Sequence, residues 1–371
     1  DYGNRQRQSD GYFRWEKNPK GRDRLAYGKK RRGAGIRMTS KEKSVKEPLF
    51  HIVKRDSIPW WKSWLIRTAA ILIAFFVSGM LSFMVLKKNP FSVYASMFSG
   101  AFGTQRRCMM FLRDGAILLL ISLAVTPAFK MRFWNTGAEG QVLISAFACT
   151  ACMFYLGGKI PDGVLIPIML LASVVAGAIW AVIPALFKAK WNTNETLFTL
   201  MMNYVAIQVV LCFIKIWVPK GTGNLDAIGY GNLPKIAGED FLLSVIVVAV
   251  ITAVVYVYLK YSKQGYEISV VGESEKTARY IGINVKKVII RTLIISGVIC
   301  GIAGFLLVGG IDHTVSKETV GGRGFTAILV SWLAKFNPIF MVLTSYLVIF
   351  LQQGTAQVMT DFPPRLGPVN T

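Results

Sequence analysis

Long apolar runs, bounded by short polar or basic stretches, recur along most of this 371-residue chain. An α-helix needs about 20 apolar residues to cross the hydrocarbon of a bilayer, so these runs predict membrane-spanning helices. We place them at residues 65–86, 111–129, 136–155, 164–187, 194–218, 241–259, 288–308, 324–336 and 337–359. The short eighth run predicts a half-helix or part of a hairpin, and the Gly-rich segment 90–110 is expected to lie in the interface or to re-enter. The fold class is therefore all-α, a polytopic transmembrane helical bundle of about nine spans.

Composition supports this fold class and sets an orientation. Hydrophobic residues make up 53% of the chain and charged residues only 17%, which is unlike a soluble domain. The formal net charge is +23, and residues 1–64 alone hold 18 Lys and Arg against 7 Asp and Glu. A basic flank on a membrane protein more often marks a cytosolic segment than a nucleic-acid site. We predict a cytosolic N-terminus and no nucleic-acid binding.

Three regions follow from these patterns. They are a basic cytosolic N-terminal tail at 1–64, a transmembrane domain at 65–359 with a cytosolic loop at 260–287, and a C-terminal tail at 360–371. Residues 1–37 are rich in Gly and Arg without apolar periodicity, whereas "MTSKEKSVKEPLF" from Met38 has the form of an ordinary protein start. We expect residues 1–37 to be disordered or not native.

Motifs for catalysis are absent from the sequence. There is no G-x-x-x-x-G-K-[ST] loop for nucleotide phosphates, no nucleophile elbow and no H-E-x-x-H pattern. We predict a protein without catalytic residues, in which any ATP is bound by another subunit. Cys149 and Cys152 form a C-x-x-C pair, but they have no second pair and no nearby His. They indicate helix packing rather than a metal or redox site.

The charged stretch "SVVGESEKTARYIGINVKK", residues 269–287, predicts a short helix between two spans. The hydroxyl of Ser274 can cap its start, and Gly282 can end it in the left-handed conformation. We expect the helix to expose Ala278, Tyr280 and Ile281. Because so short a helix is marginal alone in water, these residues pack either on the chain's own cytosolic ends or in the groove of a partner.

Two similar stretches, "WNTGAEG" and "WNTNET", begin at residues 134 and 191, each at the start of an outward-running helix. Thr136-x-x-Glu139 fits a capping box, and Asn192-x-x-Glu195 fits a looser one. Polar helix starts in transporters also face the solute path, where free N–H groups hold a polar solute. The residues leave both roles open. The candidate path residues are Asn135, Glu139, Gln141, Asn194, Glu195 and Asn203.

Gly297, Gly301 and Gly304 lie on one face of the seventh span. Small residues at this spacing let another helix approach closely, so we predict a helix-packing face. Because the face follows the loop directly, it would also be placed to pass motion from the loop to the spans.

Four stretches carry a family resemblance: "WNTGAEGQ" (134–141), "NETLFTLMMNYVA" (194–206), "GESEKTARYIGINVKKVIIRTLIISGVICGIAGFLLVGG" (272–310) and "GGRGFTAILVSWLAKFNPI" (321–339). In this order they resemble motifs of the bacterial ABC-importer permeases that carry nucleosides and simple sugars, a ribose-type family related to the branched-chain amino acid transporters. The resemblance covers roughly residues 65–359. In that family one more span follows, so the tail at 360–371 looks truncated and the final span looks absent.

The resemblance implies a role for the loop and a set of partners. In that family the loop carries the coupling helix, which sits in a cleft of the ATPase subunit. The residues implied here are Gly272, Glu273, Ala278, Arg279, Tyr280, Ile281 and Gly282. The implied partners are ATPase subunits that bind ATP and Mg, a second permease subunit, an extracytosolic solute-binding protein and the lipid of a bacterial plasma membrane. The chain itself would bind no cofactor.

We therefore predict the permease subunit of an ABC importer for a nucleoside, moving a neutral solute by alternating access. A simple sugar is the nearest alternative solute. An ion-coupled secondary transporter, from a different class, also fits the residues, because Glu139 and Glu195 could hold an ion or a proton.

Overall fold

A computed structural model describes residues 60–87, 89–218, 225–234 and 242–363 of the chain. The chain divides into two units, residues 1–66 and 67–371, and the second holds nearly all of the described structure. Most of the predicted tail at 1–64, with its segment 1–37, and most of the predicted tail at 360–371 lie outside the described residues.

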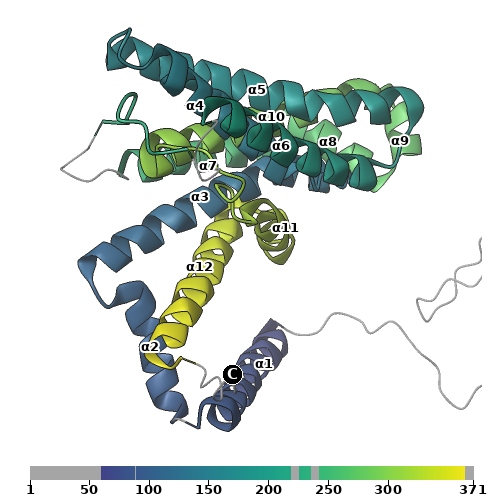
Figure 1. Ribbon diagram of the computed structural model, residues 1–371. Coiled ribbons are helices and arrows are strands. Elements are labelled where there is room, and N and C mark those ends of the chain that lie inside the picture. The colour runs from purple at the N-terminus through teal and green to yellow at the C-terminus, as the bar shows by residue number, and fades with distance from the viewer. Residues whose placement is uncertain (1–59, 88, 219–224, 235–241, 364–371) are drawn as a thin grey trace, which may run out of the picture. The chain divides into compact units, whose positions relative to one another are not determined.

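All regular secondary structure in these ranges is helical, which confirms the predicted all-α fold (Figure 1). The helices are α1 (Trp60–Leu86), α2 (Pro90–Phe102), α3 (Gln105–Lys130), α4 (Ala138–Leu156), α5 (Asp162–Trp191), α6 (Glu195–Trp217), α7 (Leu242–Tyr261), α8 (Lys263–Glu273), α9 (Glu275–Tyr280), α10 (Val285–Leu307), α11 (Arg323–Leu333) and α12 (Pro338–Asp361), with a π-helical turn η1 (Val308–Asp312) after α10.

Seven of the described helices are long and apolar enough to cross a membrane, namely α3, α4, α5, α6, α7, α10 with η1, and α12. Two shorter apolar helices, Thr68–Met84 within α1 and Arg323–Leu333, fall on the first and the eighth predicted runs. Every predicted run thus coincides with an apolar helix in the described ranges, and the polytopic bundle is confirmed. The 11 residues of α11 agree with the half-helix expected from the short eighth run.

The Gly-rich segment 90–110 forms α2 and the first turns of α3. Both helices have capped starts, because Asn89 Oδ1 accepts from Phe91 N at 3.0 Å and Thr104 Oγ1 accepts from Arg107 N at 3.3 Å. The span predicted at 111–129 therefore starts later than the helix that contains it.

The two innermost helices are α10 and α3. Their spanning windows are 72% and 67% buried, against 22% to 28% for α5, α6, α7 and α12. α10 packs on α5, α4 and α3, and α3 also packs on α11 and α12. Exposed side chains of the outer helices are largely apolar, for example Leu171, Met201, Val254 and Leu343. Such surfaces suit contact with lipid.

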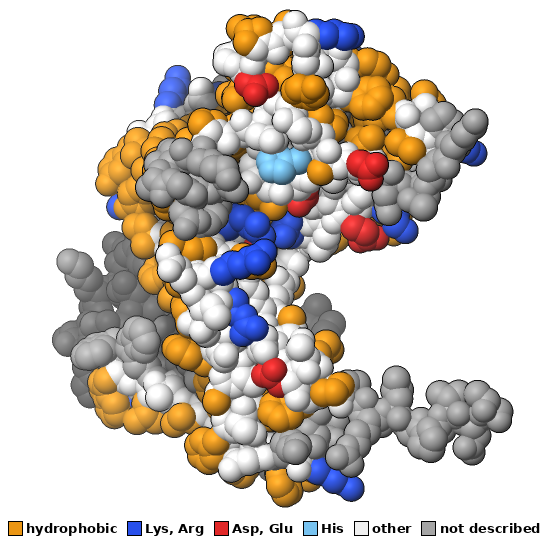
Figure 2. All heavy atoms as spheres, turned by 60° about the vertical axis from the view of Figure 1, so that its left-hand side comes forward, with side chains coloured by type: hydrophobic (Ala, Val, Ile, Leu, Met, Phe, Trp, Pro, Cys, Tyr) orange, Lys and Arg blue, Asp and Glu red, His pale blue; other side chains and the backbone are white. Residues whose placement is uncertain are grey.

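α12 runs along α3 toward α2 (Figure 1). Aromatic rings hold the three helices together, since Phe102 of α2 lies 5.0 Å from Phe111 of α3 and 6.3 Å from Phe350 of α12, measured between ring centroids. On the face in Figure 2, Lys and Arg side chains lie near acidic ones, with apolar side chains around them. Charged groups among apolar helices are costly and usually functional in membrane proteins.

Candidate functional site

The predicted loop helix is present as α9, which follows α8 after a sharp turn at Ser274. Ser274 Oγ accepts from Thr277 N at 3.2 Å, so the predicted cap is confirmed. Gly282 has a φ of 85°, which confirms the left-handed end of the helix. No heavy atom would lie within 4 Å of a Cβ at Gly282, so its backbone conformation, and not crowding, favours glycine there.

The two faces of α9 have different surroundings. Ala278 is 0% exposed and packs in an apolar cluster that includes Ala128, Phe133 and Val285, so the prediction that it is exposed was wrong. Tyr280 and Ile281 are 92% and 51% exposed, as expected. A six-residue helix turns a methyl group inward and its aromatic ring outward here because α9 lies against the ends of α3 and α10.

The loop is anchored to the spans at two further points. A Cβ at Gly272 would lie 2.2 Å from the carbonyl oxygen of Lys130, so α8 packs backbone to backbone on the end of α3. Arg291 of α10 forms an ion pair with Glu267 of α8 at 2.8 Å. The remaining predicted coupling residues, Glu273 and Arg279, are exposed. The structure thus separates an anchored inner face from an open outer face.

The candidate path residues near the start of α4 are buried and bonded to their own chain. Asn135 Oδ1 accepts from Gly137 N at 3.1 Å and its Nδ2 donates to Ser296 Oγ at 3.3 Å. Gln141 Nε2 also donates to Asn135 Oδ1, at 3.4 Å. Asn203 of α6 accepts from Gly140 N and donates to the Thr136 carbonyl, both at 2.9 Å. These amides shape the approach of the chain to α4.

Glu139 caps a helix, although not its own. Its Oε1 accepts from Gly322 N at 2.8 Å and its Oε2 accepts from Gly324 N at 2.7 Å, at the start of α11. The capping box predicted for Thr136 and Glu139 was therefore wrong, since α4 has Gly137 at its N-cap without a side-chain bond. A carboxylate at this position satisfies two amide donors of α11 and complements the helix dipole.

The second predicted box was also wrong. Asn194, not Asn192, caps α6, and its Oδ1 accepts from Leu197 N at 3.2 Å. Glu195 forms an ion pair with Lys188 at 2.8 Å, which joins the start of α6 to the end of α5.

The three predicted packing glycines lie where α10 meets its neighbours. A Cβ at Gly297 would lie 2.4 Å from the Gly177 carbonyl oxygen of α5, and one at Gly301 would lie 2.5 Å from Val174 Cα. At Gly304 the nearest atom would be Ala146 N of α4, at 2.7 Å. Backbone atoms of α10, α5 and α4 therefore approach as closely as glycine permits.

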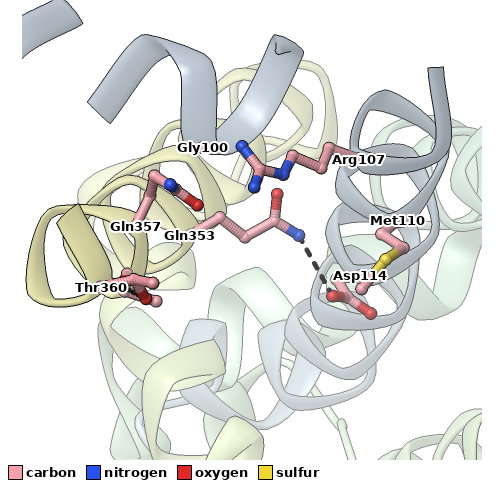
Figure 3. A pocket seen from close by; sticks show the side chains of 8 residues that line it. Gly100, Arg107, Met110, Asp114, Gln353, Gln357 and Thr360 are labelled. Atoms are coloured by element: carbon pink, nitrogen blue, oxygen red, sulfur yellow. Dashed lines mark hydrogen bonds between the residues drawn. The ribbon is translucent and has the colours of Figure 1, made fainter. Parts of the chain in front are cut away.

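A cavity of about 260 Å³ lies between α2, α3 and α12 (Figure 3). Its polar lining consists of Arg107 and Asp114 from α3 and Gln353, Gln357 and Thr360 from α12. These residues were not predicted from the sequence. The signal it held was an acidic residue inside the run at 111–129 and three glutamines near the end of the run at 337–359.

Ionic contacts fix Asp114 at one side of this cavity. Its Oδ1 lies 3.1 Å from Arg113 Nη2 and 3.8 Å from Arg323 Nη2. Its Oδ2 accepts from Gln353 Nε2 at 3.3 Å, the contact drawn in Figure 3. Helices α3, α11 and α12 thus meet at one carboxylate.

The family model "Branched-chain amino acid transport system / permease component" matches residues 108–368. The chain belongs to this permease family. The match includes the four motif stretches and confirms the predicted resemblance. As a permease component with several spanning helices, the chain is a multi-pass membrane protein.

The permease is similar to curated proteins with related names. It is 27% identical over 332 residues to the glucose ABC transporter permease protein TsgB13 of Haloferax volcanii, covering 84% of this chain and 86% of that protein. It is 28% identical over 288 residues to the guanosine ABC transporter permease protein NupP of Bacillus subtilis, covering 75% and 81%. The nucleoside ABC transporter permease protein NupB of Lactococcus lactis is 26% identical over 312 residues, covering 80% and 85%. No solved structure matches the permease at a significant level.

Proposed function

We propose that this permease imports a nucleoside as the transmembrane subunit of an ABC importer. The observation that carries the proposal is its similarity, over most of both chains, to permeases named for guanosine and for nucleosides. A simple sugar is the second candidate, because a glucose permease is similar over a still larger share of the chain.

Membership of the permease family supports the following set of partners. Separate ATPase subunits bind ATP and Mg, and this chain itself binds no cofactor and catalyses no reaction. A second permease subunit completes the transmembrane part, and a solute-binding protein delivers the solute from outside. The N-terminus lies in the cytosol of a bacterial cell, together with Lys130, Lys188 and the loop at 260–287, in line with the positive-inside rule.

Ion-coupled transport is less well supported by the contacts of the two glutamates. Both carboxylate oxygens of Glu139 accept backbone N–H bonds of α11, and Glu195 is paired with Lys188. A carboxylate that releases and takes up an ion in each cycle needs open coordination positions. Neither glutamate offers them in this arrangement.

The test is uptake of labelled guanosine into membrane vesicles that contain the complete importer. We expect uptake to require ATP and to persist when ionophores collapse the ion gradients. Excess glucose should not compete. Uptake that disappears with the gradients would support a secondary transporter, and uptake blocked by glucose would favour the sugar.

The exposed face of α9 supports a role in coupling to the ATPase. We expect Tyr280→Ala to uncouple ATP hydrolysis from transport, because truncating a central aromatic anchor of an interface costs about 2 kcal/mol or more. Solute-stimulated ATP hydrolysis and uptake are measured in the same vesicles. Tyr204→Ala, which removes an exposed ring of α6 outside the loop, is the control and should leave coupling unchanged.

Cross-linking tests the same contact directly. Single cysteines introduced as Tyr280→Cys and Ile281→Cys should cross-link to cysteines in a groove of the ATPase. Ala278→Cys should not, because that position is buried in its own chain. Cross-links at the buried position but not at the exposed ones would contradict this orientation of α9.

A further inference from the structure

We propose that the cavity between α2, α3 and α12 binds the hydroxyl groups of the transported solute, as the ribose ring of a nucleoside or as a free sugar. The proposal rests on the proposed function and gives it a location. It differs from the path predicted from the sequence, whose residues lie near α4 and α6.

The cavity offers hydrogen-bonding groups that the chain does not use up. Gln353 Nε2 is bound to Asp114, but Gln353 Oε1 is buried and has no partner among the described residues. Arg107 donates from Nη1 to the Ser99 carbonyl at 3.0 Å, which leaves other donors of its five N–H groups. Figure 3 shows both side chains in the lining, on opposite helices. Gln353 Oε1 can accept from a solute hydroxyl once its side chain turns toward the cavity, and the free N–H groups of Arg107 can donate to the same ring.

The charges of the cavity favour a neutral solute over an ion. Arg107 and Asp114 are the charged lining residues and have opposite signs. Asp114 is further compensated by Arg113 and Arg323. An anion would be attracted by Arg107 and repelled by Asp114. A cation would be attracted by Asp114 and repelled by Arg107. A polyhydroxylated neutral ring meets neither penalty, and Met110 adds an apolar wall for its C–H face.

The place of the cavity along α3 and α12 suits the entry of a solute from outside. At 1.5 Å per residue, Asp114 lies about 24 Å along α3 from Lys130, and Gln353 lies about 23 Å along α12 from Pro338. Lys130 and Pro338 stand at helix ends on the proposed cytosolic side. The cavity therefore lies near the ends of α3 and α12 that are far from the proposed cytosolic side. An importer takes up its solute from that side.

The candidate path residues are less open to a solute than the lining of this cavity. Asn135 and Asn203 are buried and hydrogen-bonded within the chain, and both carboxylate oxygens of Glu139 accept from α11. Gln141 Nε2 donates to Asn135, and Gln141 Oε1 has no partner among the described residues, but the side chain is only 1% exposed. By contrast, Gln357 and Thr360 line an accessible cavity at the end of α12.

The test measures occupancy at Thr360, on the cavity wall. In the complete importer, Thr360→Cys is alkylated with a maleimide, and the rate at that residue is followed by mass spectrometry. We expect guanosine to slow the alkylation, and 2′,3′-dideoxyguanosine, which lacks two ring hydroxyls, to slow it much less. Ribose and glucose form the second arm. Protection by guanosine but not by either sugar identifies a nucleoside, and protection by a sugar at equal concentration identifies the simple-sugar class.

Matched variants on α12 separate binding from structure. In the Thr360→Cys protein, the second substitution Gln353→Met should raise the guanosine concentration needed to protect residue 360 from alkylation about tenfold. The reason is that a hydrogen bond to the solute is lost. Gln352→Met, on the neighbouring exposed residue, should not change that concentration. Thr355→Cys is the control for Thr360→Cys, because both threonines donate to the carbonyl four residues earlier, but Thr355 does not line the cavity. Its alkylation should be insensitive to every solute.

Uptake by the same preparation separates the two proposals. ATP-driven uptake of guanosine without any protection at residue 360 would overturn the cavity site and leave the proposed function intact. The absence of both uptake and protection for every solute of the panel would overturn both. Equal protection by guanosine and its dideoxy analogue would overturn the assignment to hydroxyl groups. If Gln353→Met reduces assembly, the Thr360→Cys result decides alone, since that side chain is exposed.

Discussion

Gly297→Leu is expected to prevent the bundle from assembling. A Cβ at this position would lie 2.4 Å from the carbonyl oxygen of Gly177 and 2.8 Å from Ala178 Cα. Both are backbone atoms of α5, which cannot rotate away, so α10 and α5 must separate along the buried face that joins them. Overpacking of this kind costs about 1–3 kcal/mol even where side chains can adjust, and more is expected here. The measurement is the yield of folded protein in the membrane and its thermal unfolding in detergent.

Gly163→Leu is the matched control for this prediction. Gly163 lies in the first turn of α5, and no heavy atom would lie within 4 Å of a Cβ there. The substitution should leave stability within about 1 kcal/mol of the parent and should favour the helix slightly. A Gly297→Leu protein that unfolds at the parental temperature would show that α10 and α5 do not approach as closely as the structure indicates.

The helices were predictable from the sequence because lipid imposes a simple rule. A spanning helix must be apolar over most of its length, so hydropathy alone located each run. The start of α3 was not found in this way, because it depends on a cap. Thr104 caps the helix, and Arg107 in its first turns donates to the Ser99 carbonyl of α2. These two polar contacts stabilise the first turns of α3, although hydropathy alone describes this segment as polar.

Side-chain roles were less predictable because their partners are distant in the chain. The residues that Glu139 caps are 183 and 185 positions away, so the local pattern around "WNTGAEG" indicated the wrong helix. Asp114 and Gln353 meet across 239 positions. In the six-residue α9, too few turns exist for periodicity to tell the buried Ala278 from the exposed Tyr280. Such assignments need the packing of helices, which the sequence does not state locally.

Glu139→Ala is expected to release the start of α11. The carboxylate accepts from Gly322 N and Gly324 N at 2.8 Å and 2.7 Å, and no side chain of α11 itself caps that end. Hydrogen bonds to a charged group are worth about 1.5–3 kcal/mol, so the loss of two should cost at least about 3 kcal/mol. Transport should be lost together with stability. Thermal unfolding in detergent and uptake in vesicles are measured on the same preparations.

Two further substitutions show whether the glutamate acts as a cap or lines the solute path. Glu139→Gln retains one carbonyl oxygen and can accept from one of the two amides, so a cap predicts that stability and uptake fall together to intermediate values. A path residue predicts normal stability with uptake abolished, and that result would contradict the cap. Glu195→Ala, at the corresponding position of "WNTNET", removes a single ion pair with Lys188, whose side chain is 20% exposed. It should cost less than Glu139→Ala, because one contact is lost instead of two and the long Lys188 side chain can turn toward water. A loss as large as that of Glu139→Ala would mean that the two stretches share one role, which their different contacts argue against.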